Sequence, residues 1–244
     1  MEERLFQTAQ GPVPVWGEFA GFRADHRMLL VIRGAFPEFD QLFGLSEALP
    51  GVDVAFVHLP GMLTPFLAAS TVEAFGAAFD EVLRALEHDY VVVCGVSVGG
   101  LAALSLRSPS VRTLLLLDTP LTTTDLWPLL PVFARAAGRS AAGDDWMERI
   151  FGYRDGAVET RDYGALLAAL KTPTAVLLAS DPLGSPREFT RTPSLVSEHD
   201  RALYRAHPER IGLRVVANSG HHLVRDGQAM VVGTLRHLTR ARAS

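Results

Sequence analysis

The stretch Tyr90-Val91-Val92-Val93-Cys94-Gly95-Val96-Ser97-Val98-Gly99-Gly100-Leu101 decides the fold. It opens with a short run of β-branched residues, which is typical of a buried strand, and leads into an Ala/Leu-rich helical segment. Between the two lies a Gly-x-Ser-x-Gly turn. The glycines let a strand turn sharply into a helix where larger side chains would collide with their neighbours. We predict that this turn lifts the Ser97 hydroxyl clear of the edge of a sheet.

The rest of the chain alternates between apolar runs and amphipathic segments. Further runs that suit buried strands cover residues 28–32, 52–59, 111–117, 175–179 and 213–217. Helical spacing of apolar residues, or a helical composition, covers residues 71–86, 101–106, 195–206 and 229–238. Near-continuous apolar strands that alternate with helices indicate an α/β fold with a mostly parallel central sheet and helices on both faces. Residues 5–19, with Gly11-Pro12 in the middle, predict a hairpin at the sheet edge.

Residues 121–170 interrupt this alternation with a long segment rich in Leu, Ala, Trp and Pro. Such a segment is too long for a plain connection between two strands. It predicts either two additional core helices or, as we prefer, a helical lid over a site. The side chains expected to line a substrate pocket under this lid are Trp127, Leu130, Phe133, Trp146 and Ile150. No repeat or linker divides the chain, so we expect one domain over residues 1–244 with this insertion.

A serine hydroxyl is a weak nucleophile and needs a base, which in turn needs an acid to orient it. These groups are expected at the carboxyl ends of other strands, at the same sheet edge as Ser97. His221 is the preferred base and His222 the alternative, because both follow the last strand and the flexible Gly220. Two acids compete, since each directly follows a strand. Asp181 is preferred and Asp118 is the alternative.

An oxyanion formed by attack of Ser97 would need two hydrogen-bond donors. The backbone N–H of Val98, at the start of a helix, is one candidate. The second is expected in the loop Arg33-Gly34-Ala35-Phe36-Pro37, where the amide of Ala35 is preferred. His58, at a strand end, is a further residue that could face the site.

Composition excludes several classes of protein. The 244 residues carry 23 Lys and Arg against 27 Asp and Glu, which argues against a nucleic-acid binder. The single cysteine, Cys94, excludes an internal disulfide and a Cys-rich metal site, and its place on a strand suggests a buried spacer. We find no signal peptide and no apolar run of roughly 20 residues, so we expect a soluble, cytoplasmic protein without membrane contact.

Together, the strand order, the Gly95-to-Gly100 turn, Ser180-Asp181-Pro182-Leu183 and Gly220-His221 resemble the α/β-hydrolase fold. The resemblance implies Ser97 as nucleophile, Asp181 as acid and His221 as base, with no metal or organic cofactor. Arg33-Gly34 departs from the His-Gly of many relatives, and Val96 from the His that most often precedes the serine. A narrower similarity to thioesterases that release carrier-bound acyl chains keeps Asp118 open, because that group often takes its acid after the strand that follows the nucleophile.

The expected function is hydrolysis of a carboxylic ester or thioester with a fairly apolar acyl group, through an acyl-enzyme. An acyltransferase or cyclase, or a non-hydrolytic lyase, could use the same site and is the alternative. A binding protein built on an inactive hydrolase fold is less favoured, because every triad position has a candidate. The expected partner is a small acyl substrate, free or bound to a carrier protein. The sequence leaves open whether the protein is a monomer or a homodimer.

Overall fold

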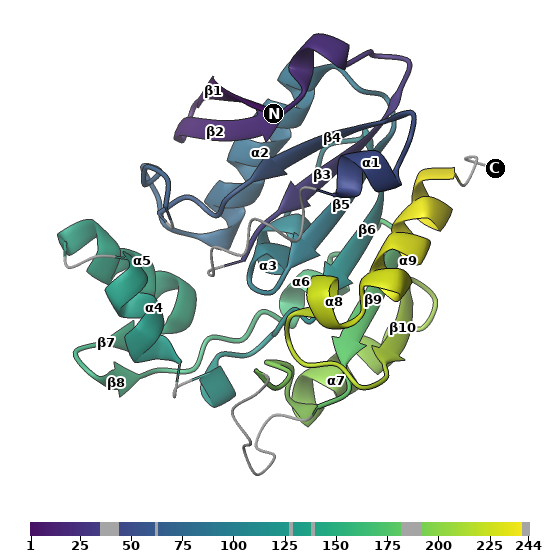
Figure 1. Cartoon of the computed structure of the whole chain (residues 1–244). Helices are drawn as coiled ribbons and strands as arrows, with labels where there is room; N and C mark the ends of the chain where they lie inside the picture. Colours follow the sequence, from purple (N-terminus) through teal and green to yellow (C-terminus); the bar gives the residue numbers. More distant parts are fainter. Residues whose placement is uncertain (35–43, 62, 127–128, 138–139, 182–191, 241–244) are drawn as a thin grey trace.

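The computed structural model describes residues 1–34, 44–61, 63–126, 129–137, 140–181 and 192–240. Within them, an eight-stranded sheet has the order β1-β2-β4-β3-β5-β6-β9-β10 (Figure 1). β2 is antiparallel to both β1 and β4, and all other neighbours are parallel. The strands are β1 (Glu2–Thr8), β2 (Gly11–Gly17), β3 (Arg27–Ile32), β4 (Val52–Val57), β5 (Val91–Val96), β6 (Val111–Leu117), β9 (Thr174–Ala179) and β10 (Ile211–Val216). The expected mostly parallel sheet with an edge hairpin is confirmed.

Helices cover both faces of this sheet, and its central strands are buried between them. Met28, Leu30 and Ile32 of β3 pack in a core shared with α2 (Val72–Leu86) and α3 (Gly99–Leu104). The alternate residues Leu29 and Val31 pack in a second core. That core includes residues of α1 (Leu45–Ala48), α8 (Leu223–Asp226) and α9 (Gln228–Arg240). α7 (Glu198–Arg205) precedes β10. This two-sided burial explains why the strands read as continuous apolar runs rather than alternating ones.

The segment between β6 and β9 folds mainly as helices. It contains η2 (Thr124–Leu126), α4 (Leu130–Ala137), α5 (Ala141–Phe151), the hairpin of β7 (Tyr153–Arg154) and β8 (Ala157–Val158), and α6 (Ala165–Ala168). Figure 1 shows α4, α5 and the small hairpin as a group of their own beside the sheet. Ser140 caps the start of α5, because its hydroxyl accepts a hydrogen bond from Gly143 N–H at 3.0 Å. Gly152 caps the end of the helix in the left-handed conformation.

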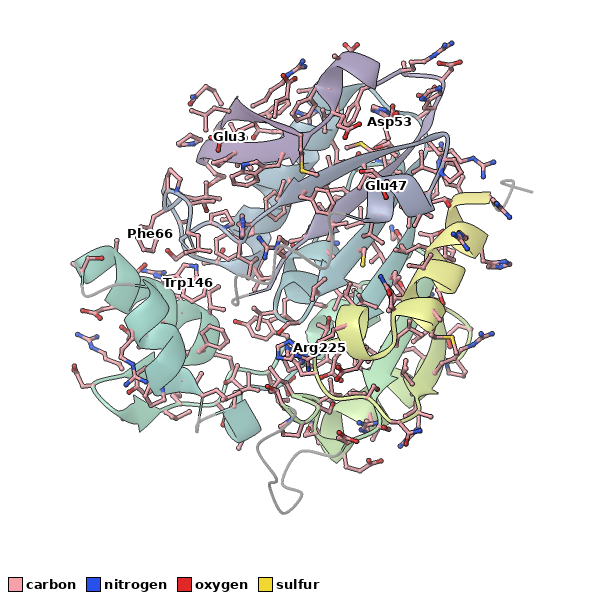
Figure 2. The ribbon with its side chains drawn as sticks, in the orientation of Figure 1. Glu3, Glu47, Asp53, Phe66, Trp146 and Arg225 are labelled. Carbon is pink, nitrogen blue, oxygen red and sulfur yellow. The ribbon has the colours of Figure 1, made fainter. Side chains whose placement is uncertain are left out.

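Trp146 connects this insertion to the loop that follows β4. Its side chain is fully buried on α5, and its indole N–H donates to the carbonyl of Pro60 at 2.8 Å. Pro60 lies in the loop that follows β4. A Cβ atom built on Gly61 would lie 2.7 Å from the ring of Phe66 and 2.8 Å from that of Trp146, so both rings pack on this loop (Figure 2). The insertion is therefore held against the carboxyl end of β4.

Cys94 lies on β5 and is buried, and burial raises the pKa of its thiol to about 12. It is protonated at neutral pH and packs among apolar side chains, as expected of a spacer. None of the helices in the described ranges is long and apolar enough to cross a membrane.

The buried carboxylate of Asp53, near the start of β4, connects three neighbouring residues through hydrogen bonds. Asp53 lies on β4 and bonds His26 at 3.0 Å, His88 at 2.9 Å and the Arg23 amide at 2.8 Å. The second ring nitrogen of His88 lies 2.6 Å from the Leu86 carbonyl, so both ring nitrogens of His88 face oxygen atoms. Burial acts to raise the pKa of Asp53, but hydrogen bonds from His88, the Arg23 amide and His26 outweigh it and lower that pKa.

Replacing this carboxylate should destabilise the fold in a pH-dependent way. Because the folded-state pKa of Asp53 is depressed, its contribution is present above the unfolded-state value of about 4 and is lost as pH falls through the folded value. We expect Asp53→Asn to lower the free energy of unfolding by about 2 kcal/mol at pH 7, since a neutral amide replaces a buried carboxylate that accepts three hydrogen bonds. The deficit should shrink toward pH 3. Urea unfolding at both pH values measures this.

The matched control is Asp25→Asn, which breaks an exposed ion pair with Arg23 in the same region. It should leave the urea midpoint unchanged, because exposed ion pairs are screened by solvent. Equal midpoints for the two variants at pH 7 would show that Asp53 does not stabilise the fold as described.

Candidate active site

Ser97 sits at a strained turn between β5 and α3. Its φ of 54° lies in the left-handed region, which is uncommon for a residue with a side chain. The turn is fixed by hydrogen bonds from Ser97 N–H to the Leu117 carbonyl at 2.8 Å and from Gly100 N–H to the Ser97 carbonyl at 2.9 Å. A Cβ on Gly99 would lie 2.5 Å from the Ile32 carbonyl oxygen, so the turn packs directly against the end of β3. The geometry agrees with the turn predicted from the glycine pattern.

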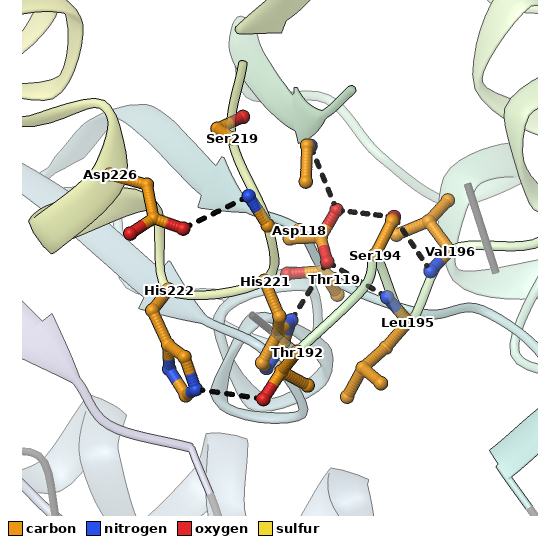
Figure 3. Close-up of polar contacts among 12 residues, drawn as sticks. Asp118, Thr119, Thr192, Ser194, Leu195, Val196, Ser219, His221, His222 and Asp226 are labelled. Carbon is orange, nitrogen blue, oxygen red and sulfur yellow. Dashed lines mark hydrogen bonds and ion pairs between the residues drawn. The ribbon is translucent and has the colours of Figure 1, made fainter. Parts of the chain in front are cut away.

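His221 and Asp118 form a buried pair at the same edge of the sheet. His221 Nδ1 lies 2.7 Å from Asp118 Oδ2, and both side chains are nearly inaccessible to solvent (Figure 3). Asp118 directly follows β6, and His221 lies between β10 and α8. The turn that carries His221 is braced by Gly220 N–H, which donates to Asp226 at 3.0 Å. Because Nδ1 is occupied by the carboxylate, Nε2 is left as the ring atom that could accept a proton.

Four donors surround the Asp118 carboxylate. Oδ1 accepts from the Ala179 amide at 3.0 Å and the Ser194 hydroxyl at 2.7 Å, while Oδ2 accepts from the Leu195 amide at 2.9 Å and from His221. Burial acts to raise the pKa of Asp118. The hydrogen bond and charge of His221, helped by the other donors, more than offset this and hold the pKa below its ordinary value. The site therefore keeps an ionised carboxylate in a dry environment.

Of the two acids that the sequence offers, the structure places the alternative, Asp118, against His221. The main chain of Asp181 joins the turn, since its N–H donates to Ser219 at 3.0 Å and its carbonyl accepts from Ser194 at 2.8 Å. The carboxylate bonded to His221 belongs to Asp118 instead. Asp118 has a φ of 45°, and its N–H donates to the Leu177 carbonyl of β9. This backbone directs its side chain across the end of β9 toward the β10 loop, a feature that residue order alone does not reveal.

His222 and His58 occupy different surroundings from His221. The ring of His222 makes an edge contact with that of His221, 5.5 Å between centroids, and its Nε2 lies 3.2 Å from Thr192 Oγ1. His58 is buried, with Nε2 2.8 Å from Arg33 Nη1. Burial, together with the charge of Arg33, lowers the pKa of His58 to about 4. The Arg33 guanidinium can only donate, so His58 accepts this bond as a neutral ring.

The expected oxyanion donors are placed only in part. Val98 immediately precedes α3, and the first N–H groups of a helix lack acceptors within it. Gly34 approaches from β3, because a Cβ on it would lie 2.8 Å from Ser97 Cβ and 3.4 Å from Ser97 Oγ. Gly34 therefore lies directly beside the Ser97 hydroxyl. Ala35 itself lies outside the described residues.

The residues expected to line a pocket are packed in the main core where they are described. Leu130, Trp146 and Ile150 are almost completely buried and belong to the same apolar cluster as the α2 and α3 side of the sheet. Trp127 and the side chain of Phe133 lie outside the described part of the chain. The burial of the other three shows that they hold the insertion together, and their role as a pocket wall stays a prediction.

Three residues that the sequence does not mark contact the pair from one segment before α7: Thr192, Ser194 and Leu195. The Thr192 carbonyl accepts from His221 N–H at 2.8 Å, next to the Ser194 and Leu195 contacts to Asp118. No motif marks such residues, because their placement depends on the path of the chain between β9 and α7. Among the residues that the structure describes, no group of three or more His, Cys, Asp or Glu side chains is arranged to hold a metal ion.

Comparisons with known proteins agree with this architecture. No curated protein sequence matches the chain significantly. Solved structures with similar folds include the carboxylesterase CesB (YbfK) from Bacillus subtilis, with a TM-score of 0.69 and 13% identity over 100% of this chain and 93% of that chain. The esterase EaEST from Exiguobacterium antarcticum has a TM-score of 0.69 and 14% identity over 98% and 100%. A thermophilic esterase from Thermogutta terrifontis has a TM-score of 0.66 and 18% identity over 98% of both chains.

At these identities the structural matches show a shared fold. The sequence profile of the alpha/beta hydrolase family matches residues 21–232, which include Ser97, Asp118 and His221. The match covers most of the chain, from before β3 into α9. With the strained serine turn and the buried His–Asp pair at one sheet edge, this match shows that the chain belongs to the alpha/beta hydrolase family.

Proposed function

We propose that this protein is a serine hydrolase that cleaves a carboxylic ester or thioester with a fairly apolar acyl group. Ser97 is the nucleophile, His221 the general base and Asp118 the acid that orients it. The observation that carries the proposal is the 2.7 Å contact between His221 Nδ1 and Asp118 Oδ2, both buried, at the sheet edge that carries the strained Ser97 turn.

In the first half-reaction, the Ser97 oxygen attacks the acyl carbon while His221 Nε2 takes the hydroxyl proton. Asp118 keeps the Nδ1–H tautomer of His221 and stabilises the imidazolium that forms. The tetrahedral intermediate collapses as the bond between the acyl carbon and the leaving oxygen or sulfur breaks. His221 returns its proton to that leaving atom, and the acyl group stays on Ser97.

In the second half-reaction, His221 takes a proton from water as the water oxygen attacks the acyl-enzyme. The second tetrahedral intermediate releases the carboxylic acid, and the proton returns to Ser97. In both steps the negative oxygen would be held by the Val98 N–H and by an amide of the loop after Gly34. An alcohol acceptor in place of water would make the same site an acyltransferase.

The apolar character of the proposed acyl group rests on the insertion. Residues 121–170 are rich in Leu and Ala, and Trp146 holds this insertion against the loop after β4. Parallel strands end at one edge, so that loop and Ser97 lie at the same edge of the sheet. A lid with an apolar inner wall would favour apolar acyl chains through burial of their surface.

The nucleophile is tested with p-nitrophenyl esters. We expect the wild type to hydrolyse p-nitrophenyl butyrate with an initial burst of p-nitrophenol, because with this good leaving group the acyl-enzyme forms faster than it is hydrolysed. Ser97→Ala should lower kcat by about 10³-fold or more and remove the burst. A folded Ser97→Ala protein that keeps most of its activity would favour the non-hydrolytic alternative.

The choice of acid and base is tested by two matched pairs of variants. Asp118→Asn should lower kcat/KM by about 10³- to 10⁴-fold, because the amide holds His221 in the wrong tautomer. Asp181→Asn should change it little. His221→Gln should likewise abolish turnover, whereas the neighbouring His222→Gln should retain it. If Asp181→Asn were the more damaging of the two acid variants, the assignment of Asp118 would be wrong.

The pocket is tested with a series of p-nitrophenyl esters and acyl thioesters from two to twelve carbons. We expect kcat/KM to rise with chain length by up to about tenfold for every two buried methylenes, and then to level off at the end of the pocket. Ile150→Ala should move this plateau to longer chains if the insertion lines the pocket. A chain-length profile identical to that of the wild type would place the acyl group elsewhere.

A further inference from the structure

We propose that Ser194 is a positioning residue for the Asp118–His221 pair. This role rests on the proposed serine-hydrolase function. In that role Ser194 acts through Asp118 and does not contact the substrate. Ser194 is fully buried and lies in the segment that runs from Thr192 toward α7. Its hydroxyl contacts Asp118 Oδ1 at 2.7 Å, on the opposite carboxylate oxygen from His221 (Figure 3).

The surroundings of Ser194 fix the direction of its proton. Its oxygen accepts from the Val196 amide at 3.1 Å and lies 3.5 Å from Nη2 of the Arg201 guanidinium. Both of these groups can only donate. The single hydroxyl proton must therefore point to the third neighbour, Asp118 Oδ1. Ser194 is a dedicated donor to the carboxylate and cannot act as its acceptor.

This donor controls the rotation of the carboxylate. The Ala179 amide and Ser194 hold Oδ1, and the Leu195 amide holds Oδ2 in place beside His221 Nδ1. Asp118 and Ser194 are both completely buried, so bulk water has no direct access to replace a lost donor. Without the hydroxyl, Oδ1 would keep only the Ala179 amide, and the plane of the carboxylate would be less tightly set. His221 would then be oriented less well for proton transfer.

Arg201 strengthens the hydrogen bond that the Ser194 hydroxyl donates. Its guanidinium is largely buried and also donates to the Ala179 carbonyl at 2.9 Å, while Glu198 lies 3.9 Å away on the exposed side. The cation therefore lies beside the Ser194 hydroxyl, 3.5 Å from its oxygen. A positive charge at an accepting hydroxyl polarises its O–H bond and strengthens the hydrogen bond that it donates.

The test compares Ser194→Ala with Thr122→Val. Thr122 is a matched control, since its buried hydroxyl donates to the Asp200 carboxylate at 2.8 Å without touching Asp118. Each variant removes one buried hydroxyl-to-carboxylate bond, so both should lose a similar amount of thermal stability. We expect Ser194→Ala to lower kcat for p-nitrophenyl butyrate by about tenfold with KM changed less than about twofold. Thr122→Val should keep the wild-type kcat.

A proton NMR spectrum reports on the hydrogen bond between His221 and Asp118 independently of catalytic activity. The His221 Nδ1–H bonded to Asp118 should give a resonance far downfield, which Ser194→Ala shifts or broadens and Thr122→Val leaves in place. Ser194→Thr retains the hydroxyl and should keep both the resonance and a kcat near the wild-type value. The proposal is overturned if folded Ser194→Ala matches Thr122→Val in kcat and in this resonance, or if folded Ser194→Thr loses activity as Ser194→Ala does.

Failure of this inference differs from failure of the proposed function. If the wild type neither hydrolyses the ester series nor depends on Ser97, the hydrolase assignment itself fails. If the wild type is active and depends on Ser97, Asp118 and His221 but not on the Ser194 hydroxyl, only the positioning role is wrong.

Discussion

The site depends on one buried carboxylate that stays charged. Asp118 has no exposure to solvent, and an isolated charge in such a place would be strongly unfavourable. It is stabilised because four donors from three parts of the chain meet on its two oxygens. Each donor needs its own element in place. β9 supplies Ala179, the segment before α7 supplies Ser194 and Leu195, and the loop after β10 supplies His221.

The same constraint links the fold to the chemistry. Ser97 N–H bonds to the Leu117 carbonyl, so the Ser97 turn is attached to the residue that precedes Asp118. Asp118 N–H in turn bonds to the Leu177 carbonyl on β9. A displacement of β6 would therefore move Ser97 and Asp118 together rather than separate them. Ser97 and Asp118 both have a left-handed backbone conformation, and the surrounding sheet stabilises this strain.

Most of the fold could be predicted from local patterns. Apolar strand runs and the Gly-x-Ser-x-Gly turn are short-range signals, so the parallel sheet, the Ser97 turn and the His221 loop follow from the sequence. Which carboxylate contacts His221 does not follow from the sequence, because Asp118 and Asp181 both directly follow strands. What separates them is a backbone conformation at Asp118 that carries its side chain across β9. The contact between Ser194 and Asp118 is harder still to predict from the sequence. It depends on where the long connection between β9 and α7 returns to the edge of the sheet.

The most direct test of the central claim is the mapping of a covalent adduct. The folded protein is treated with an alkyl fluorophosphonate, digested and analysed by peptide mass spectrometry. If the buried Asp118–His221 pair activates Ser97, one adduct should form, on the Ser97 hydroxyl, and protein unfolded in urea before the reagent is added should give none. A folded protein that is not modified, or that carries the adduct on another residue, would contradict the account.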